Sequence, residues 1–204
     1  MKAAVFEEVG QPLVLRELPT PRPGPGQLLL KVEACGVCGS DIHASMGAVP
    51  PGTILGHEYA GRVVEVGTGV GAEWRTGDKL IAIGAKVCGT CPACLRGEQL
   101  AFETLVMQGF DLVEQGAYAE YTLCHADMAF KLPADFDPKQ AAAVEPLSVG
   151  LQAWRAAQVA PGSDVLVIGG GAIGLAVVKW ARFFGARSVT VSEMVPGGTA
   201  PMLA

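Results

Sequence analysis

The chain has 204 residues, half of them hydrophobic, with 15 basic and 20 acidic residues and a formal net charge of −5. Such a length and apolar content allow one substantial core, or one domain and part of another, so extensive disorder is not expected. The mild negative charge and the lack of a basic run exclude nucleic acid as a partner. No apolar stretch approaches the roughly 20 residues that span a bilayer, and the first residues lack the form of a secretory signal. We therefore expect a cytoplasmic protein without a membrane partner.

Two kinds of pattern follow one another along the chain. Up to residue 135, short apolar or alternating runs separated by glycine and proline predict β-strands, the clearest over residues 28–37. From Pro138 the composition becomes alanine-rich and helical, and residues 165–186 read as a buried strand, a glycine turn and a helix. A further strand follows at SVTVSE. We predict a β domain over residues 1–153 and the beginning of an α/β domain over residues 154–204.

A dinucleotide-binding fingerprint lies at this glycine turn. Gly169, Gly171 and Gly174 fit G-x-G-x-x-G between an apolar strand and a helix, with Ile173 inside the motif. The first glycine permits a tight turn, the second lets a pyrophosphate approach the backbone, and the third allows close helix packing. Glu193, at the end of the next strand, is placed to accept hydrogen bonds from the adenosine ribose, which favours NAD over NADP. The alternative is a glycine-rich turn without a ligand.

A candidate metal site is formed by Cys38 and the pair His57-Glu58. They offer a thiolate, an imidazole and a carboxylate, a ligand set that suits zinc. A buried free cysteine and a loop histidine are common without a metal, so the residues alone leave both interpretations open.

Four segments in order resemble the zinc-containing medium-chain alcohol dehydrogenases: GVCGSDIH, GHEYAGRVVEVG, GDKL and VLVIGGGAIGL. The resemblance implies a GroES-like β domain followed by a Rossmann domain, with Cys38, His57 and Glu58 as ligands of a catalytic zinc. The segment AAAVEPLSVGLQAW is similar to the sorbitol, threonine and butanediol dehydrogenase branch. This similarity implies that Glu145 is the fourth ligand, directly or through water; otherwise it is a helix-surface carboxylate.

The same resemblance implies a reaction. Zinc, as a Lewis acid, would lower the pKa of a secondary alcohol or polyol, and a hydride would pass to NAD(P), giving a ketone or aldehyde. Ser40 and His43 match the positions that relay the proton to solvent, because a hydroxyl and an imidazole can both donate and accept. Their alternatives are a loop cap and a solvated turn residue. We interpret Asp41 as structural.

A second cysteine cluster departs from the family pattern. Cys88, Cys91 and Cys94 resemble a lobe that binds a structural zinc, but the position of the family's fourth cysteine is Phe102. A structural zinc site needs four protein ligands, so a second, structural zinc is doubtful. The three thiolates could recruit Glu98, Glu103 or water, or the lobe could be free of metal.

The chain also stops after what reads as the second strand of a doubly wound domain, which needs about six. We therefore expect an incomplete Rossmann domain. Besides the zinc-dependent dehydrogenase, two alternatives remain: a truncated, non-catalytic zinc-binding module, and a zinc-free quinone or enone reductase of the same superfamily. Relatives assemble through a sheet edge that this chain lacks, so a homo-oligomer is possible but not supported.

Overall fold

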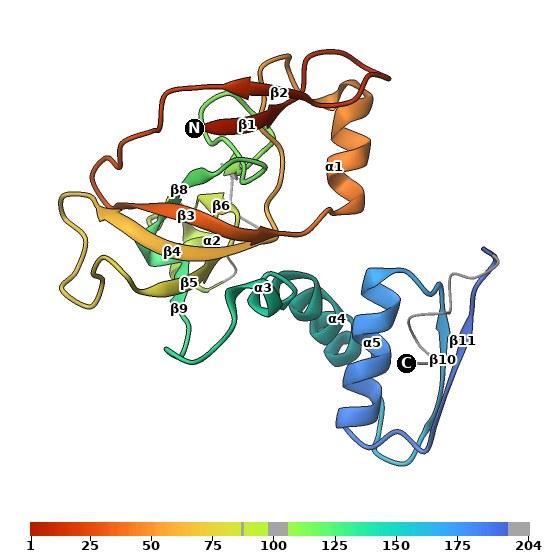
Figure 1. Ribbon diagram of the computed structural model, residues 1–204. Helices are drawn as coiled ribbons and strands as arrows, with labels where there is room; N and C mark the ends of the chain where they lie inside the picture. Colours follow the sequence, from red (N-terminus) through yellow and green to blue (C-terminus); the bar gives the residue numbers. More distant parts are fainter. Residues whose placement is uncertain (87, 98–105, 196–204) are drawn as a thin grey trace. The chain divides into compact units, whose positions relative to one another are not determined.

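The chain forms two compact units, Met1–Ala143 and Val144–Ala204. Figure 1 shows the computed structural model, which describes residues 1–86, 88–97 and 106–195. The first unit is built from β-strands and the second from helices packed beside a parallel strand pair, so the predicted order of a β domain followed by an α/β domain is confirmed. Within those ranges, no helix combines the length and the apolar character that crossing a membrane requires.

A five-stranded antiparallel sheet with the order β8-β3-β4-β5-β9 organises the first unit. Its strands are β3 (Gln27–Cys35), β4 (Tyr59–Val66), β5 (Lys79–Ala82), β8 (Tyr121–His125) and β9 (Ala129–Lys131). The β3–β4 pairing ends with Cys35 opposite Tyr59. The segment that leaves β3 therefore lies beside the segment that enters β4.

Shorter elements surround this sheet (Figure 1). Two further antiparallel pairs are β1 (Lys2–Val5) with β2 (Val14–Glu17), and β6 (Ala85–Lys86) with β7 (Val106–Met107). The helical segments are α1 (Gly39–His43), the π-helical turn η1 (Ala44–Ala48), α2 (Pro92–Leu95), the 3-10 turn η2 (Ala126–Met128) and α3 (Pro138–Ala141).

The core of the first unit lies against the central strands of the sheet. Leu28 and Leu30 on β3, Val63 on β4 and Leu80 on β5 are fully buried, and removing such side chains from water stabilises the fold by about 1.5–3 kcal/mol each. The buried Tyr59 hydroxyl donates a hydrogen bond of 2.7 Å to Gln108 Oε1, which satisfies its polar end. Tyr59 is thereby held firmly at the start of β4.

The second unit contains α4 (Val144–Ala157), β10 (Asp164–Ile168), α5 (Ala172–Phe183) and β11 (Ser188–Ser192). β10 and β11 pair in parallel across α5, as in the beginning of a doubly wound sheet. The two helices pack closely, because a Cβ added to Gly150 would lie 2.5 Å from Ala176 Cβ. Trp180 Nε1 also donates a hydrogen bond of 2.7 Å to Leu147 O.

This packing explains where the chain divides. The expected boundary followed residue 153, whereas the compact units meet after Ala143, ten residues earlier. α4 belongs with the second unit because its apolar face covers α5, with Trp154 stacked on Phe184 at 6.1 Å between ring centroids. The alanine-rich segment is thus two helices, α3 and α4, one in each unit.

Candidate metal centre and dinucleotide loop

Cys38, His57 and Glu58 come together beside the end of the β3–β4 pair. One potential ligand atom from each lies within 4.8 Å of the others. Cys38 follows β3 and begins α1, whereas His57 and Glu58 directly precede β4. A backbone hydrogen bond holds the two segments together, because Gly36 N–H donates to Glu58 O at 2.7 Å. Cys38 is half-buried, and His57 and Glu58 are buried, with exposed fractions of 6% and 7%.

The Asp41 carboxylate fixes the loops that carry these residues. Buried in α1, it accepts hydrogen bonds from Cys38 N–H at 2.9 Å, Gly56 N–H at 3.3 Å and the Tyr118 hydroxyl at 2.8 Å. The three donors come from separate parts of the chain. Cys38 directly precedes α1, Gly56 directly precedes His57, and Tyr118 is 77 residues beyond Asp41. Burial alone would raise the pKa of Asp41, but His57, Tyr118 and the Cys38 backbone lower it. Asp41 is therefore an anionic hub within the site.

The imidazole of His57 faces this hub. His57 Nδ1 lies 3.3 Å from Asp41 Oδ1, but it forms no well-aligned hydrogen bond within the described ranges. Burial alone would lower the pKa of His57, yet Asp41 and Cys38 outweigh it and raise the pKa to about 9. The Phe110 ring, 5.6 Å from the imidazole between centroids, limits its freedom on another side.

Charge balance at this cluster favours a cation. Glu58 and Asp41 are buried carboxylates, and no lysine or arginine among the described residues forms an ion pair with either. When His57 is neutral, as metal ligation requires, these buried charges have no counter-ion, which is costly, and a thiolate at Cys38 would add to them. Gly36 makes room for Glu58, because a Cβ there would lie 2.2 Å from Glu58 Oε2. Donor set, burial and charge therefore fit a divalent ion such as zinc.

The other residues predicted for this centre lie on the helices α1 and α4. Ser40 and His43 are both on α1, where Ser40 is half-buried and His43 is exposed. Neither side chain forms a hydrogen bond with Cys38, His57 or Glu58 in the part of the chain described by the structure. Glu145 is half-buried in the first turn of α4, within the second unit.

The second cysteine cluster lies in the segment that follows β6. Sulfur atoms of Cys88, Cys91 and Cys94 all lie within 4.8 Å of one another. Cys91 is the N-cap of α2, and its sulfur accepts a hydrogen bond from Cys94 N–H. Backbone N–H groups of Thr90 and Cys91 lower the pKa of the Cys88 thiol to about 6. Phe102, Glu98 and Glu103 lie outside the described residues.

The predicted glycine fingerprint forms the turn between β10 and α5. Gly169 has a φ of +99°, a left-handed conformation that side chains rarely adopt. A Cβ on Gly174 would lie only 2.0 Å from Gly169 O, so this glycine allows α5 to pack against the turn. A Cβ on Gly171 would meet nothing within 4 Å, which leaves open space at the N-cap of α5. Gly169 and Gly174 thus have the turn and packing roles that the motif predicts, whereas the role of Gly171 toward a pyrophosphate stays a prediction.

Glu193 lies over this turn from the end of β11. Its carboxylate accepts hydrogen bonds from Gly170 N–H at 2.6 Å and Val195 N–H at 2.8 Å. The N–H groups of Val195 and Gly170 lower the pKa of Glu193, so it is an anion at neutral pH. Ile173, in the first turn of α5, is 38% exposed. No side chain of the described residues caps α5, so its first N–H groups are open to an anion.

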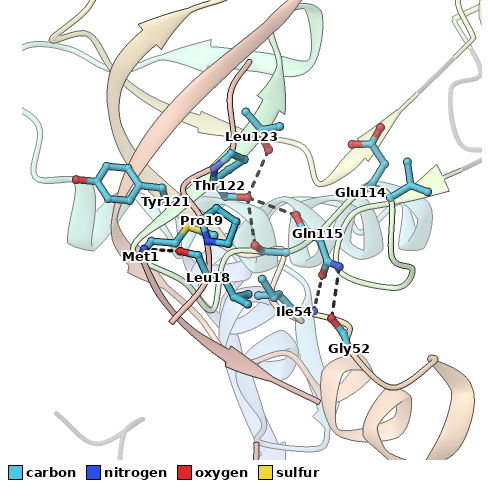
Figure 2. Close-up of a pocket in the computed structure, with 13 residues that line it drawn as sticks. Met1, Leu18, Pro19, Gly52, Ile54, Glu114, Gln115, Tyr121, Thr122 and Leu123 are labelled. Atoms are coloured by element: carbon cyan, nitrogen blue, oxygen red, sulfur yellow. Dashed lines mark hydrogen bonds between the residues drawn. The ribbon is translucent and has the colours of Figure 1, made fainter. Parts of the chain in front are cut away.

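A pocket of about 330 Å³ lies elsewhere in the first unit. Figure 2 shows it between the N-terminal segment around Met1 and Leu18 and the segment around Gln115. The Gln115 amide accepts from Ile54 N–H and donates to Gly52 O, so its polar atoms are satisfied within the protein. The lining includes none of the candidate metal or proton-relay residues.

Comparison with known proteins places the chain beside alcohol dehydrogenases. Residues 24–134 match the alcohol dehydrogenase GroES-like domain. The chain is 33% identical to the sorbitol dehydrogenase of Bacillus subtilis strain 168, over 96% of this chain and 56% of that protein. It is 37% identical, with a TM-score of 0.89, to a proposed zinc-binding dehydrogenase of Sinorhizobium meliloti 1021 bound to NADP, over 98% of this chain and 58% of that one.

A second solved structure carries the other cofactor. Acetophenone reductase from Geotrichum candidum NBRC 4597 in complex with NAD is 33% identical, with a TM-score of 0.85, over 98% of this chain and 59% of that one. In all three comparisons, the chain spans less than two thirds of the relative's length.

Proposed function

Because the chain belongs to the zinc-dependent medium-chain alcohol dehydrogenase family, we propose that it carries the metal centre and part of the dinucleotide site of an NAD-linked oxidoreductase. The substrate class is a secondary alcohol or polyol, which is oxidised to a ketone or aldehyde. One observation supports this proposal most directly: the ligand atoms of half-buried Cys38 and of buried His57 and Glu58 converge within 4.8 Å of one another.

In this proposal Cys38, His57 and Glu58 hold zinc, and Glu145 is the fourth ligand, directly or through water. When bound, zinc supplies a Lewis acid that lowers the pKa of an alcohol. Asp41 positions the imidazole: a proton on His57 Nδ1 is favoured by the carboxylate 3.3 Å away, which leaves Nε2 as the free lone pair. Asp41 also holds the Cys38 backbone, so one carboxylate orients two ligands.

The proposed cofactor is NAD rather than NADP. Gly171 leaves space for a pyrophosphate at the N-terminus of α5, where backbone N–H groups favour an anion. Glu193 is held beside this turn as an anion, able to accept hydrogen bonds from ribose hydroxyls and to repel a 2′-phosphate. Ile173 would contact the dinucleotide from the first turn of α5.

Ser40 and His43 are the proposed proton relay. Both lie on α1, directly after Cys38, and their exposure rises from half-buried Ser40 to exposed His43. This order suits a path that carries a proton from a buried alcohol outward, because each group can both accept and donate.

The two alternative functions differ from the proposed one in whether the chain binds zinc and whether it binds a dinucleotide. A zinc-free reductase of the superfamily would have no need for a thiolate, an imidazole and a carboxylate converging in a buried cluster. A non-catalytic zinc module would keep that cluster but would not bind a dinucleotide. The cytoplasmic location stays a prediction.

The proposal is tested by measuring zinc content and NAD affinity on purified chain of verified mass. We expect about one tightly held zinc ion per chain and saturable NAD binding that is stronger than NADP binding. Zinc without NAD binding would favour the non-catalytic module. NADPH binding without zinc would favour the reductase.

Replacing Asp41 with asparagine is expected to weaken zinc binding by about 10–100-fold, because the amide keeps the size of the carboxylate but loses the charge that orients His57. The measurement is competition with a chelator of known affinity. Tyr118→Phe is the matched control, since it removes one donor from the same carboxylate and leaves its charge. Equal losses in both variants, or none in Asp41→Asn, would contradict the positioning role.

A further inference from the structure

The cysteine lobe after β6 has a geometry that the proposed dehydrogenase reaction does not use. Cys88 Sγ and Cys94 Sγ are 3.7 Å apart, in direct contact. Cys88 is exposed, whereas Cys94 is half-buried. A disulfide requires a sulfur separation of about 2.05 Å, so the two sulfur atoms would have to move about 1.6 Å closer to be joined.

The lobe does not fit a four-thiolate zinc site. Among the described residues, three cysteines form the cluster and no fourth histidine, cysteine or carboxylate joins them. The family resemblance implies a fourth cysteine at position 102, where this chain has phenylalanine, a residue type without a ligand atom. A structural zinc site normally has four protein ligands, and losing one weakens it severely. The thiols of this lobe are therefore available for other chemistry.

We propose that Cys88 and Cys94 are a redox-active thiol pair that exchanges with small aliphatic disulfides of the glutathione type. Cys88 is the attacking thiol because it is exposed, and the Cys91 N–H donates a hydrogen bond of 3.4 Å to its sulfur, which favours the thiolate. Cys94 is the resolving thiol because its sulfur already contacts that of Cys88.

The exchange balances in two steps. The Cys88 thiolate attacks one sulfur of the small disulfide, forms a mixed disulfide and releases one small thiolate. The Cys94 thiolate then attacks Cys88 Sγ, which forms the Cys88–Cys94 bond and releases the second small thiolate. Two protein thiols are oxidised, one small disulfide is reduced, and the two protons pass to the released thiolates.

Cys91 and Cys124 are less suited to this exchange. The Cys91 sulfur caps α2 by accepting the Cys94 N–H, so oxidation of Cys91 would remove the cap. Cys124 is buried, with an exposed fraction of 3% on β8. Burial also raises the pKa of the Cys124 thiol to about 12, so it stays protonated at neutral pH.

The test incubates the 204-residue chain with oxidised glutathione, quenches with acid, alkylates free thiols and maps the peptides by mass. We expect an internal Cys88–Cys94 disulfide, a loss of about 2 Da, that dithiothreitol reverses. Cys94→Ser should instead accumulate a glutathione adduct on Cys88, and Cys88→Ser should form no disulfide in the lobe. Cys91→Ser is the matched control and should still form the Cys88–Cys94 bond.

Three results would overturn the proposal. The first is an adduct on Cys91 rather than Cys88 in Cys94→Ser, and the second is failure of Cys91→Ser to form the bond while its circular dichroism spectrum is unchanged. The third is a chelator-resistant zinc ion retained by the chain after Cys38→Ser, together with no exchange at Cys88. That result would assign the lobe to metal binding.

Discussion

A Cys38→Ser chain is expected to lose most of its bound zinc and all alcohol oxidation. Serine keeps the shape of the side chain but replaces the thiolate, the strongest of the three donors within 4.8 Å, with a neutral hydroxyl. His57, Glu58 and the proposed ligand Glu145 would remain, but a set without the thiolate holds zinc more weakly. Zinc per chain is measured by atomic emission after dialysis against a mild chelator. Oxidation is measured as NADH formed from a panel of secondary alcohols and polyols, with the unmodified chain as the reference.

Cys88→Ser is the control for this experiment. It removes a thiol of the same kind from the lobe after β6 and leaves the candidate centre unchanged. Its zinc content should equal that of the unmodified chain. Full zinc retention in Cys38→Ser, or equal losses in the two variants, would refute the assignment of Cys38 as a ligand.

Gly174→Ala is expected to destabilise the second unit and to abolish dinucleotide binding. Alanine in a helix is intrinsically favoured over glycine by about 1 kcal/mol. Here the added Cβ would lie 2.0 Å from Gly169 O, a backbone atom that cannot move without displacing the turn. Overpacking of this kind costs about 1–3 kcal/mol, so we expect a net loss of unfolding free energy. Denaturant unfolding followed by the fluorescence of Trp154 and Trp180 measures it.

Gly171→Ala separates the ligand from the fold at the same turn. Its Cβ would meet no protein atom within 4 Å, and its φ of −68° suits alanine. We expect unchanged stability but weaker NAD binding, because the methyl group occupies the space proposed for the pyrophosphate. Native stability and NAD affinity in Gly174→Ala would contradict the packing argument. Unchanged affinity in Gly171→Ala would place the pyrophosphate elsewhere.

The sequence predicts those parts of the molecule that local patterns determine. The spacing of Gly169, Gly171 and Gly174 predicts a turn between a strand and a helix, and the structure places Gly169 and Gly171 between β10 and α5 and Gly174 in the first turn of α5. The convergence of Cys38 with His57 and Glu58 is also confirmed, because the β3–β4 pairing brings their two segments together. Their role as zinc ligands stays a prediction.

Contacts between residues far apart in the chain could not be predicted from the sequence. The structural role predicted for Asp41 agrees with the structure, but the sequence does not reveal that its carboxylate accepts hydrogen bonds from the segments of both Cys38 and Gly56. Tyr118, 77 residues beyond Asp41 in the sequence, donates a hydrogen bond to its carboxylate. A single tyrosine belongs to no sequence pattern from which this partner could be predicted. The boundary between the units follows residue 143 rather than the predicted residue 153, because α4 packs on α5 with Trp154 against Phe184. No local sequence pattern specifies that pairing.

The Asp41 hub has a consequence for how such a protein matures. Asp41 links the segments before α1 and before β4 through the protein's own hydrogen bonds, and the buried leucines of β3 and β5 hold the sheet beneath them. The donors are therefore assembled by folding rather than by the ion, unlike small domains that are unfolded without their metal. We expect the first unit to acquire its tertiary structure on leaving the ribosome in a zinc-starved cell. Metal supply would then govern only the fraction of folded molecules that carries the ion, and adding zinc would load the remaining molecules without new synthesis.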